Sequence, residues 1–271
     1  MDKYIIYEII GKGSYGIVYR AYDTINDRYI AIKEINKSKI ANKQRLDDEI
    51  NILKYLEKSE CNNIVSKYYD TFSDDENVFI IMEYIEGIVL SKYILLSDGG
   101  KINIKVLLSI YYELAKGLEC IHSKGIAHRD IKLDNIIIIE DGSIKYIDFG
   151  LSCIQNCIED NCENLCGSRA GQVGTPLYFP PEWKILNVKN ISRIQLAQKG
   201  DVWSLGIVMY ELANKKRYPG PFRYSKYGSN YGDPTIDNLI KFILNPDPHS
   251  RLTASELKSL ISNIIKETIF I

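Results

Sequence analysis

The chain has 271 residues, of which 45% are hydrophobic and 25% are charged. Its 34 Lys and Arg residues nearly balance its 35 Asp and Glu residues, so the formal net charge is −1. This composition is ordinary for a globular protein and excludes the strong field that would attract nucleic acid or an anionic membrane. We therefore expect neither as a partner.

The N-terminal sequence MDKYIIYEIIGKG enters a patterned segment at once, without the basic and apolar regions of a secretory signal. Asp2 excludes N-myristoylation, which requires Gly at that position. The apolar run at residues 136–139 has the length of a strand rather than of a membrane span. We expect a cytoplasmic protein, monomeric by default, whose six Cys residues are thiols or metal ligands before they are disulfides.

Residues 4–35 alternate apolar and polar side chains with Gly breaks, which predicts three short antiparallel strands. Residues 42–57 carry aliphatic side chains at helical spacing and predict a helix. Residues 65–72 and 77–85 predict two further strands on either side of a turn-rich segment. The N-terminal part, about residues 1–86, is therefore expected to be rich in strands with one helix.

The remainder, about residues 87–271, is expected to be mainly helical. A strand hairpin is predicted around Glu140-Asp141-Gly142. Residues 151–180 are polar, contain Gly and Cys, and lack a clear period, which is typical of functional or mobile segments. Helices are predicted at residues 104–123, 201–213, 235–244 and 253–266, and the second of these is apolar on nearly all sides, as a buried helix is.

The segment Gly11-Lys12-Gly13-Ser14-Tyr15-Gly16 has the spacing G-x-G-x-x-G. It lacks the Lys-Ser/Thr of a Walker loop, and the following residues favour a strand rather than the helix of a dinucleotide-binding fold. A hairpin turn without function fits the spacing alone equally well. A hairpin that lacks side chains can also lie over phosphates and offer them backbone N–H groups.

Lys33 shares a strand face with the small residue Ala31 and would point under the glycine segment, towards phosphates. A Lys in an apolar strand is more commonly a surface residue. A buried ammonium group would need a carboxylate partner. Glu49 is the candidate because it borders the apolar stripe of the predicted helix, and Asp48 is its competitor.

Residues 126–139 read IAHRDIKLDNIIII, with charged residues directly in front of an apolar strand. The run from His128 to Asn135 resembles the catalytic loop of eukaryotic-type protein kinases, and further motifs follow in the order of that family. The resemblance covers about residues 4–260. It implies an α+β, two-lobed fold in a single catalytic domain, residues 1–271, with an N-lobe at about 1–86, a C-lobe at about 87–271 and an activation segment at about 148–182. The further motifs are Asp148-Phe149-Gly150, Pro181-Glu182, Asp201-Val202-Trp203-Ser204-Leu205-Gly206 and Arg251.

The resemblance implies transfer of the γ-phosphate of ATP, with Mg²⁺, to a protein hydroxyl. Asp130 would accept or orient the proton of the hydroxyl, and Lys132 would steady the γ-phosphate. Asn135 and Asp148 would hold Mg²⁺ through oxygen atoms. Lys33, fixed by Glu49, would bind the α- and β-phosphates in a cleft that it shares with Asp148.

An ATP site is implied as well, in which the glycines cover the nucleotide, aliphatic side chains enclose adenine and backbone groups of Glu83 and Ile85 bind it. Its residues would be Ile10, Gly11, Lys12, Gly13, Ser14, Tyr15, Gly16, Val18, Ala31, Lys33, Met82, Glu83, Ile85 and Ile137. Other motif residues would have structural roles. His128 would pack against Phe149, Asp201 would hold the catalytic-loop backbone, and Glu182 would pair with Arg251. His122 and His249 are expected at surface or cap positions.

Lys132 and the sequence Gly174-Thr175-Pro176-Leu177-Tyr178 resemble Ser/Thr kinases rather than tyrosine kinases. Two alternatives are a pseudokinase that binds nucleotide as a scaffold, and a small-molecule kinase on the same fold. The intact set Lys33, Glu49, Asp130, Asn135 and Asp148 disfavours the first. The glycine segment and the Pro-Glu motif disfavour the second.

Arg129 precedes Asp130 and would need an anion, which phosphorylation of Ser168, Ser152 or Thr175 would supply. Acidic residues of the same segment are an alternative source. Cys153, Cys157, Cys162 and Cys166 fall in the activation segment, and the family pattern does not require them. Unligated thiols, a zinc site and a redox-sensitive pairing are the three interpretations of this cluster, because its spacing is not that of common zinc sites.

Overall fold

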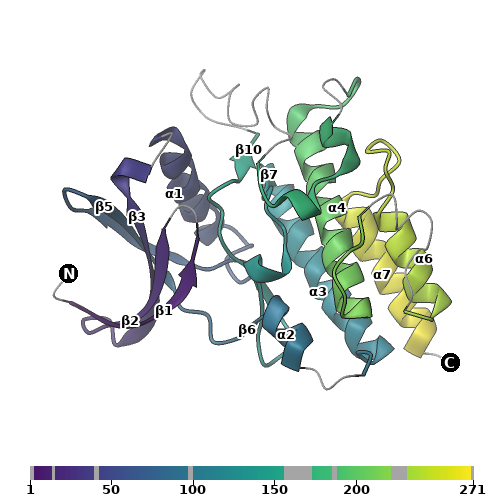
Figure 1. The fold of residues 1–271 in the computed structure, drawn as a ribbon, viewed down its shortest axis with the longest axis horizontal. Coiled ribbons are helices and arrows are strands. Elements are labelled where there is room, and N and C mark those ends of the chain that lie inside the picture. The colour runs from purple at the N-terminus through teal and green to yellow at the C-terminus, as the bar shows by residue number, and fades with distance from the viewer. Residues whose placement is uncertain are drawn as a thin grey trace. The chain divides into compact units, whose positions relative to one another are not determined.

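The computed structural model describes residues 3–13, 16–39, 43–96, 100–155, 173–184, 188–220 and 231–269. The chain divides into two compact units, Met1–Glu86 and Gly87–Ile271 (Figure 1). The first is built on a β-sheet and the second is mainly helical, so the α+β fold class predicted from the sequence is confirmed.

The N-terminal unit contains a five-stranded antiparallel sheet in the order β1-β2-β3-β5-β4. One face carries a core of Tyr4, Ala21, Ile30, Ile32, Phe79 and Ile81. These positions alternate along their strands, which is the periodicity that predicted the strands from the sequence. The strands are β1 (Tyr4–Lys12), β2 (Ile17–Asp23), β3 (Arg28–Asn36), β4 (Tyr68–Ser73) and β5 (Asn77–Glu83), and the helix is α1 (Lys43–Glu57).

The C-terminal unit packs helices around α4, and α3 contacts both α4 and α7. Two small sheets lie beside the helices, β6-β8-β9 and β10-β7, and they hold the ends of the predicted catalytic loop. The helices are α2 (Leu90–Leu96), α3 (Ile104–Ser123), α4 (Arg193–Asn214), α6 (Pro234–Ile243) and α7 (Ala254–Ile269). The strands are β6 (Ile88–Val89), β7 (Ile126–Ala127), β8 (Ile136–Ile138), β9 (Ile144–Tyr146) and β10 (Cys153–Ile154).

Helix α4 is the centre of this unit, because its side chains are buried on all sides from Gly200 to Ala213. At Gly206 a Cβ atom would lie 2.6 Å from Cγ2 of Ile243, so glycine allows α6 to pack closely against α4. The sequence prediction began this helix at residue 201, which is eight residues too late. Its true start is marked by a capping box, in which Ser192 and Gln195 exchange hydrogen bonds.

Other elements were not predicted at all. Helix α2 has seven residues, and β6, β7 and β10 have two residues each, which is too short for a periodic pattern. No helix in the described part of the chain is long and apolar enough to cross a bilayer.

Candidate active site

Three side chains converge at the catalytic loop of the C-terminal unit. Lys132 Nζ donates a hydrogen bond of 2.7 Å to Asp130 Oδ2, and Thr175 Oγ1 donates one of 2.9 Å to Asp130 Oδ1. Lys132 Nζ also lies 3.2 Å from Thr175 Oγ1. Asp130 is buried, so its carboxylate depends on these donors. The structure thus places a Thr hydroxyl between a carboxylate and an ammonium group.

Asn135 supports the same carboxylate from the far end of the loop. Its Nδ2 donates to the backbone oxygen and to Oδ2 of Asp130, both at 2.9 Å. These two bonds use both amide hydrogens, and Oδ1 keeps its lone pairs for another partner. The N–H of Ile147 donates to the backbone oxygen of Asn135 at 3.0 Å, which ties the exposed residue Asp148 to the loop. An amide oxygen and a carboxylate are donors that suit Mg²⁺.

The backbone around this loop adopts conformations that side chains disfavour. Arg129 and Asp148 have positive φ angles of 67° and 64°. A positive φ is strained for a residue with a side chain, so it persists only where surrounding contacts hold the backbone in place. Residues of this kind cluster at functional sites. Gly174 has φ of +113°, and a Cβ atom there would lie 2.6 Å from the backbone oxygen of Arg129. Only glycine therefore brings the Thr175 segment this close to the catalytic loop.

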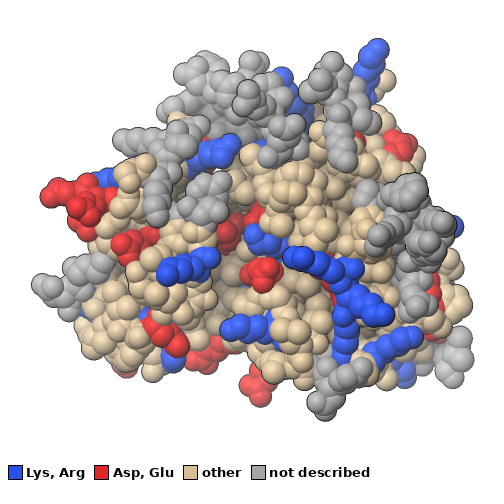
Figure 2. Space-filling view, viewed as in Figure 1, with Lys and Arg blue, Asp and Glu red and all other residues tan. Residues whose placement is uncertain are grey.

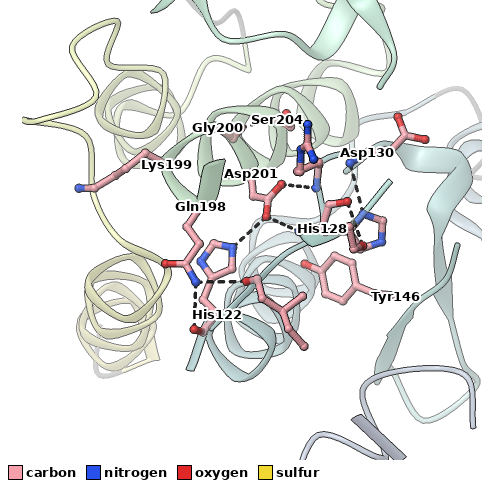
Figure 3. A network of polar contacts seen from close by, with 12 residues as sticks. His122, His128, Asp130, Tyr146, Gln198, Lys199, Gly200, Asp201 and Ser204 are labelled. Atoms are coloured by element: carbon pink, nitrogen blue, oxygen red, sulfur yellow. Dashed lines mark hydrogen bonds and ion pairs between the residues drawn. The ribbon is translucent and has the colours of Figure 1, made fainter. Parts of the chain in front are cut away.

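The carboxylate of Asp201 binds the backbone of the catalytic loop, as Figure 3 shows. Its Oδ2 accepts the N–H of His128 and its Oδ1 accepts the N–H of Arg129, both at 2.7 Å. The Nε2 of His122 lies 3.0 Å from Oδ2 of the same carboxylate. The expectation that His122 occupies a surface or cap position is wrong, since its side chain is 10% exposed. Its place four residues after the buried Leu118 of α3 was the signal that could have shown this.

The ring of His128 is a packing and positioning group. Its centroid lies 4.8 Å from that of Phe149. Its Nδ1 accepts the N–H of Asp130 at 3.3 Å, while Nε2 lies 3.1 Å from the backbone oxygen of Ile147. Through these contacts the ring joins Asp130 to Ile147, the residue before Asp148.

The segment after Thr175 is anchored to α4. Tyr178 donates its hydroxyl hydrogen to Glu211 Oε2 at 2.7 Å, and Ser204 Oγ donates to the backbone oxygen of Tyr178 at 2.9 Å. Glu211 Oε1 also accepts the N–H of Tyr218 at 3.0 Å. Burial, followed by the bond to Glu211, raises the pKa of Tyr178 far above its ordinary value of 10.0, so the phenol remains a donor at any physiological pH.

A buried ion pair fixes the end of this segment. Arg251 Nη1 lies 2.6 Å from Glu182 Oε1, and Nη2 lies 2.8 Å from Glu182 Oε2. Their side chains are 0% and 1% exposed. The pair is bidentate, the geometry in which Arg binds a carboxylate most strongly.

We expect Arg251→Met to lower the free energy of unfolding by about 3–5 kcal/mol, because it leaves the buried carboxylate of Glu182 without its partner. Denaturant titration followed by circular dichroism measures this loss. Lys116→Met is the matched control, since it removes the more exposed pair that Lys116 makes with Glu113 at 2.9 Å and should cost less than about 1 kcal/mol. Equal losses in the two variants would contradict the role given to Glu182 and Arg251.

The N-terminal unit carries a second buried ion pair. Lys33 Nζ lies 2.6 Å from Glu49 Oε1, and the two side chains are 9% and 6% exposed. Asp48, the competing candidate, instead accepts a hydrogen bond from Gln44 Nε2 at 3.0 Å, and burial raises its pKa. The structure thus brings Lys33 together with the carboxylate on the core-facing side of α1.

Most of the residues expected to bind nucleotide lie in the N-terminal unit. Val18 and Ala31 share the sheet face of Lys33, because Val18 lies opposite Lys33 and Ala31 lies two residues before it. Met82 on β5 lies opposite Ala31. Ile10, Gly11 and Lys12 end β1, and the N–H of Gly13 donates to the oxygen of Gly16 at 3.0 Å across the turn, while Ser14 and Tyr15 lie outside the described residues.

Backbone groups at the end of β5 already have partners. The N–H of Glu83 donates to the oxygen of Lys67 at 2.8 Å, and the oxygen of Glu83 accepts from Ser66 Oγ at 3.1 Å. Ile85 follows and is buried, and Ile137 lies in the C-terminal unit on β8.

The cysteines differ from the expectation of thiols. Cys153, buried in β10 opposite Ala127, is disulfide-bonded, and so are Cys61 and Cys120. The thiol interpretation is therefore wrong for these three residues. Cys157, Cys162 and Cys166 lie outside the described residues, as does the candidate phosphorylation site Ser168. The zinc interpretation is also wrong for Cys153, because a disulfide sulfur is not a thiolate ligand, and it stays a prediction for the other three residues of the cluster.

A sheet-based unit with a glycine turn and a Lys–Glu pair, and a helical unit with this Asp–Lys–Asn loop, have the organisation of a protein kinase. A family model described as protein kinase domain matches residues 4–260, and the chain belongs to this family.

Curated relatives carry names of the same class. Serine/threonine-protein kinase STE20 of Candida glabrata is 35% identical over 264 residues, which cover 92% of this chain and 26% of that protein. STE20 of Saccharomyces cerevisiae is 36% identical over 271 residues, or 94% of this chain and 26% of that protein. Serine/threonine-protein kinase Nek1 of Mus musculus is 29% identical over 268 residues, or 98% and 20%. The chain thus spans about a quarter of the length of these STE20 proteins and a fifth of Nek1.

Proposed function

We propose that the protein transfers the γ-phosphate of ATP to Ser and Thr hydroxyls of protein substrates. The observation that carries this proposal is the contact of the Thr175 hydroxyl with Asp130 Oδ1 at 2.9 Å and with Lys132 Nζ at 3.2 Å. This contact supports the proposal, because Thr175 has the same hydroxyl group as the proposed substrates. A substrate hydroxyl in an equivalent position has its proton aimed at a carboxylate.

In the proposed reaction Asp130 accepts the hydroxyl proton as the substrate oxygen bonds to the γ-phosphorus, and the bond from phosphorus to the oxygen of ADP breaks. Lys132 stabilises the charge on the transferring group. Asn135 Oδ1 and the carboxylate of Asp148 would hold Mg²⁺, which neutralises charge on the phosphate oxygens when bound. Asn135 also keeps Asp130 oriented through its two hydrogen bonds.

The N-terminal unit supplies the nucleotide contacts in this proposal. Lys33, oriented by Glu49, binds the α- and β-phosphates, and the backbone of the glycine segment covers them. Val18 and Ala31 on the same sheet face provide apolar contact for adenine. The proposal requires that these residues and those of the catalytic loop act on one molecule of ATP.

The relatives support protein substrates and Ser/Thr acceptors, because their names describe serine/threonine-protein kinases. The alternative of a pseudokinase gains no support from the side chains, since Asp130, Lys132, Asn135 and Asp148 are all present in the motif.

Incubation with [γ-³²P]ATP, Mg²⁺ and a generic Ser/Thr-rich protein tests the proposal. We expect acid-stable label on phosphoserine and phosphothreonine after hydrolysis, and no label when EDTA removes the divalent cation or when [α-³²P]ATP is the donor. Nucleotide binding without any transfer would establish the pseudokinase alternative, and label on phosphotyrosine alone would refute the Ser/Thr assignment.

A further inference from the structure

Strand β1 exposes an unusual amount of apolar surface. Five of its large side chains, Ile5, Ile6, Tyr7, Ile9 and Ile10, are between 45% and 55% exposed. β1 also forms one edge of the sheet, with β2 as its neighbour in the sheet order. In Figure 2 the surface over the region of β1 and β2 is mostly uncharged. Edge strands of monomeric proteins are normally protected by charge, Pro, β-bulges or shortness. β1 has nine residues and two register shifts, and its charged residues are Glu8 and Lys12, while five large apolar or aromatic side chains remain exposed.

Two irregularities in β1 decide which side chains share a face. Ile6 lies opposite Ala21 and Ile9 lies opposite Tyr19. Two residues lie between Ile6 and Ile9 on β1, but only Arg20 lies between Ala21 and Tyr19 on β2. Tyr7 is the extra residue of this bulge, and it places Ile6 and Ile9 on one face, which is the face of the core residue Ala21. In a regular strand Ile6 and Ile9 would point to opposite faces.

The other face of β1 is polar and aromatic. Glu8 lies opposite Arg20, and Arg20 Nη1 lies 3.4 Å from Glu8 Oε1. The ring of Tyr7 lies 6.0 Å from that of Tyr29, and the guanidinium of Arg20 stacks 4.5 Å from Tyr29. Arg20 Nε is buried and has no hydrogen-bond partner among the described residues. This face therefore carries a guanidinium group beside the aromatic rings of Tyr7 and Tyr29.

We propose that β1 pairs antiparallel with β1 of a second copy of this chain, about a two-fold axis between Tyr7 and Glu8. The sequence Ile5-Ile6-Tyr7-Glu8-Ile9-Ile10 has two Ile residues on each side of that axis. Ile6 then lies opposite Ile9 of the partner subunit, and Tyr7 lies opposite Glu8 of the partner subunit. A two-fold interface of this kind closes on itself and stops at the dimer.

In the proposed register, the residues that lie opposite each other belong to the same face of the sheet. A strand without the extra residue Tyr7 could not meet this condition. Opposite residues of an antiparallel pair project to the same face. Ile6 and Ile9 both lie on the core face, and Tyr7 and Glu8 both lie on the face of Arg20. On one face, two Ile residues from each copy continue the apolar core across the interface. On the other, Glu8 of the partner subunit approaches Arg20, which supplies an attractive charge pair.

Sedimentation equilibrium over a wide range of protein concentrations tests the proposal on the intact chain. We expect a reversible monomer–dimer equilibrium that is weakened by about tenfold or more in the variant Ile6→Lys/Ile9→Lys, because charged edge residues prevent strand pairing. Ile25→Lys, at a 72% exposed turn position of the same unit, and Phe242→Lys, at a 65% exposed position on α6, are matched controls that should dimerise like the wild type. Thermal unfolding confirms that each variant is folded.

A charge swap tests the contribution of Glu8 and Arg20 to association. Glu8→Arg should weaken the dimer, because it brings two cations together, and Glu8→Arg/Arg20→Glu should restore it. A wild-type chain that stays monomeric throughout would overturn the proposal. So would dimers that persist in the double Lys variant, or association that grows without limit and never reaches a dimer plateau.

Discussion

Replacing Asp130 with Asn is expected to reduce kcat for protein phosphorylation by about 10²–10⁴-fold and to leave the KM for ATP nearly unchanged. Asn has the shape of Asp and can keep an oxygen near Lys132, but it cannot accept the proton of the substrate hydroxyl. The carboxylate of Asp130 does not belong to the proposed nucleotide contacts, so binding of ATP should survive. Steady-state kinetics with varied ATP and protein substrate measure both constants.

Asp134→Asn is the matched control, because Asp134 is an exposed carboxylate of the same loop, four residues after Asp130. It removes the same charge from the same segment, and most of the activity should remain. Similar losses in the two variants would mean that loop charge in general, rather than proton acceptance by Asp130, supports the reaction. Full activity of Asp130→Asn would refute its assignment as the base.

The long strands and helices could be predicted from the sequence because the spacing of apolar residues within each segment indicates its secondary structure. The alternation in β3 and β5 and the apolar stripe of α3 each specify one buried face. The start of α4 was missed because the apolar run begins only near residue 201, although the helix begins at Arg193. The two-residue strands β7 and β10 exist only because each pairs with the other, which no local pattern encodes.

The catalytic loop could be recognised because its charged residues are close together in sequence. Its support could not, because the partners are far apart. Asp201 lies 79 residues after His122, and nothing in the local sequence of either one indicates the hydrogen bond. The disulfide bonding of Cys61, Cys120 and Cys153 was not predicted for a related reason, since spacing does not determine which Cys residues form disulfides. The close approach of Gly174 to Arg129 is likewise a property of the assembled unit.

Lys33→Met is expected to reduce kcat/KM by about 10²–10³-fold, the loss typical of removing one group that stabilises developing charge. It should also destabilise the N-terminal unit by about 3–5 kcal/mol, because the carboxylate of Glu49 stays buried without its cation. Lost activity alone would therefore not distinguish a phosphate-binding role from a structural one. Kinetics and denaturant unfolding must be measured on the same preparations.

The double variant Lys33→Met/Glu49→Leu separates the two roles. It replaces both members of a pair whose side chains are 9% and 6% exposed, so no buried charge is left alone. Such replacements are commonly neutral or stabilising, and most of the lost unfolding free energy should return. Activity should not return, because no ammonium group is present to bind phosphate. If activity recovers together with stability, Lys33 serves only to neutralise Glu49, and the nucleotide-binding role proposed for it is wrong.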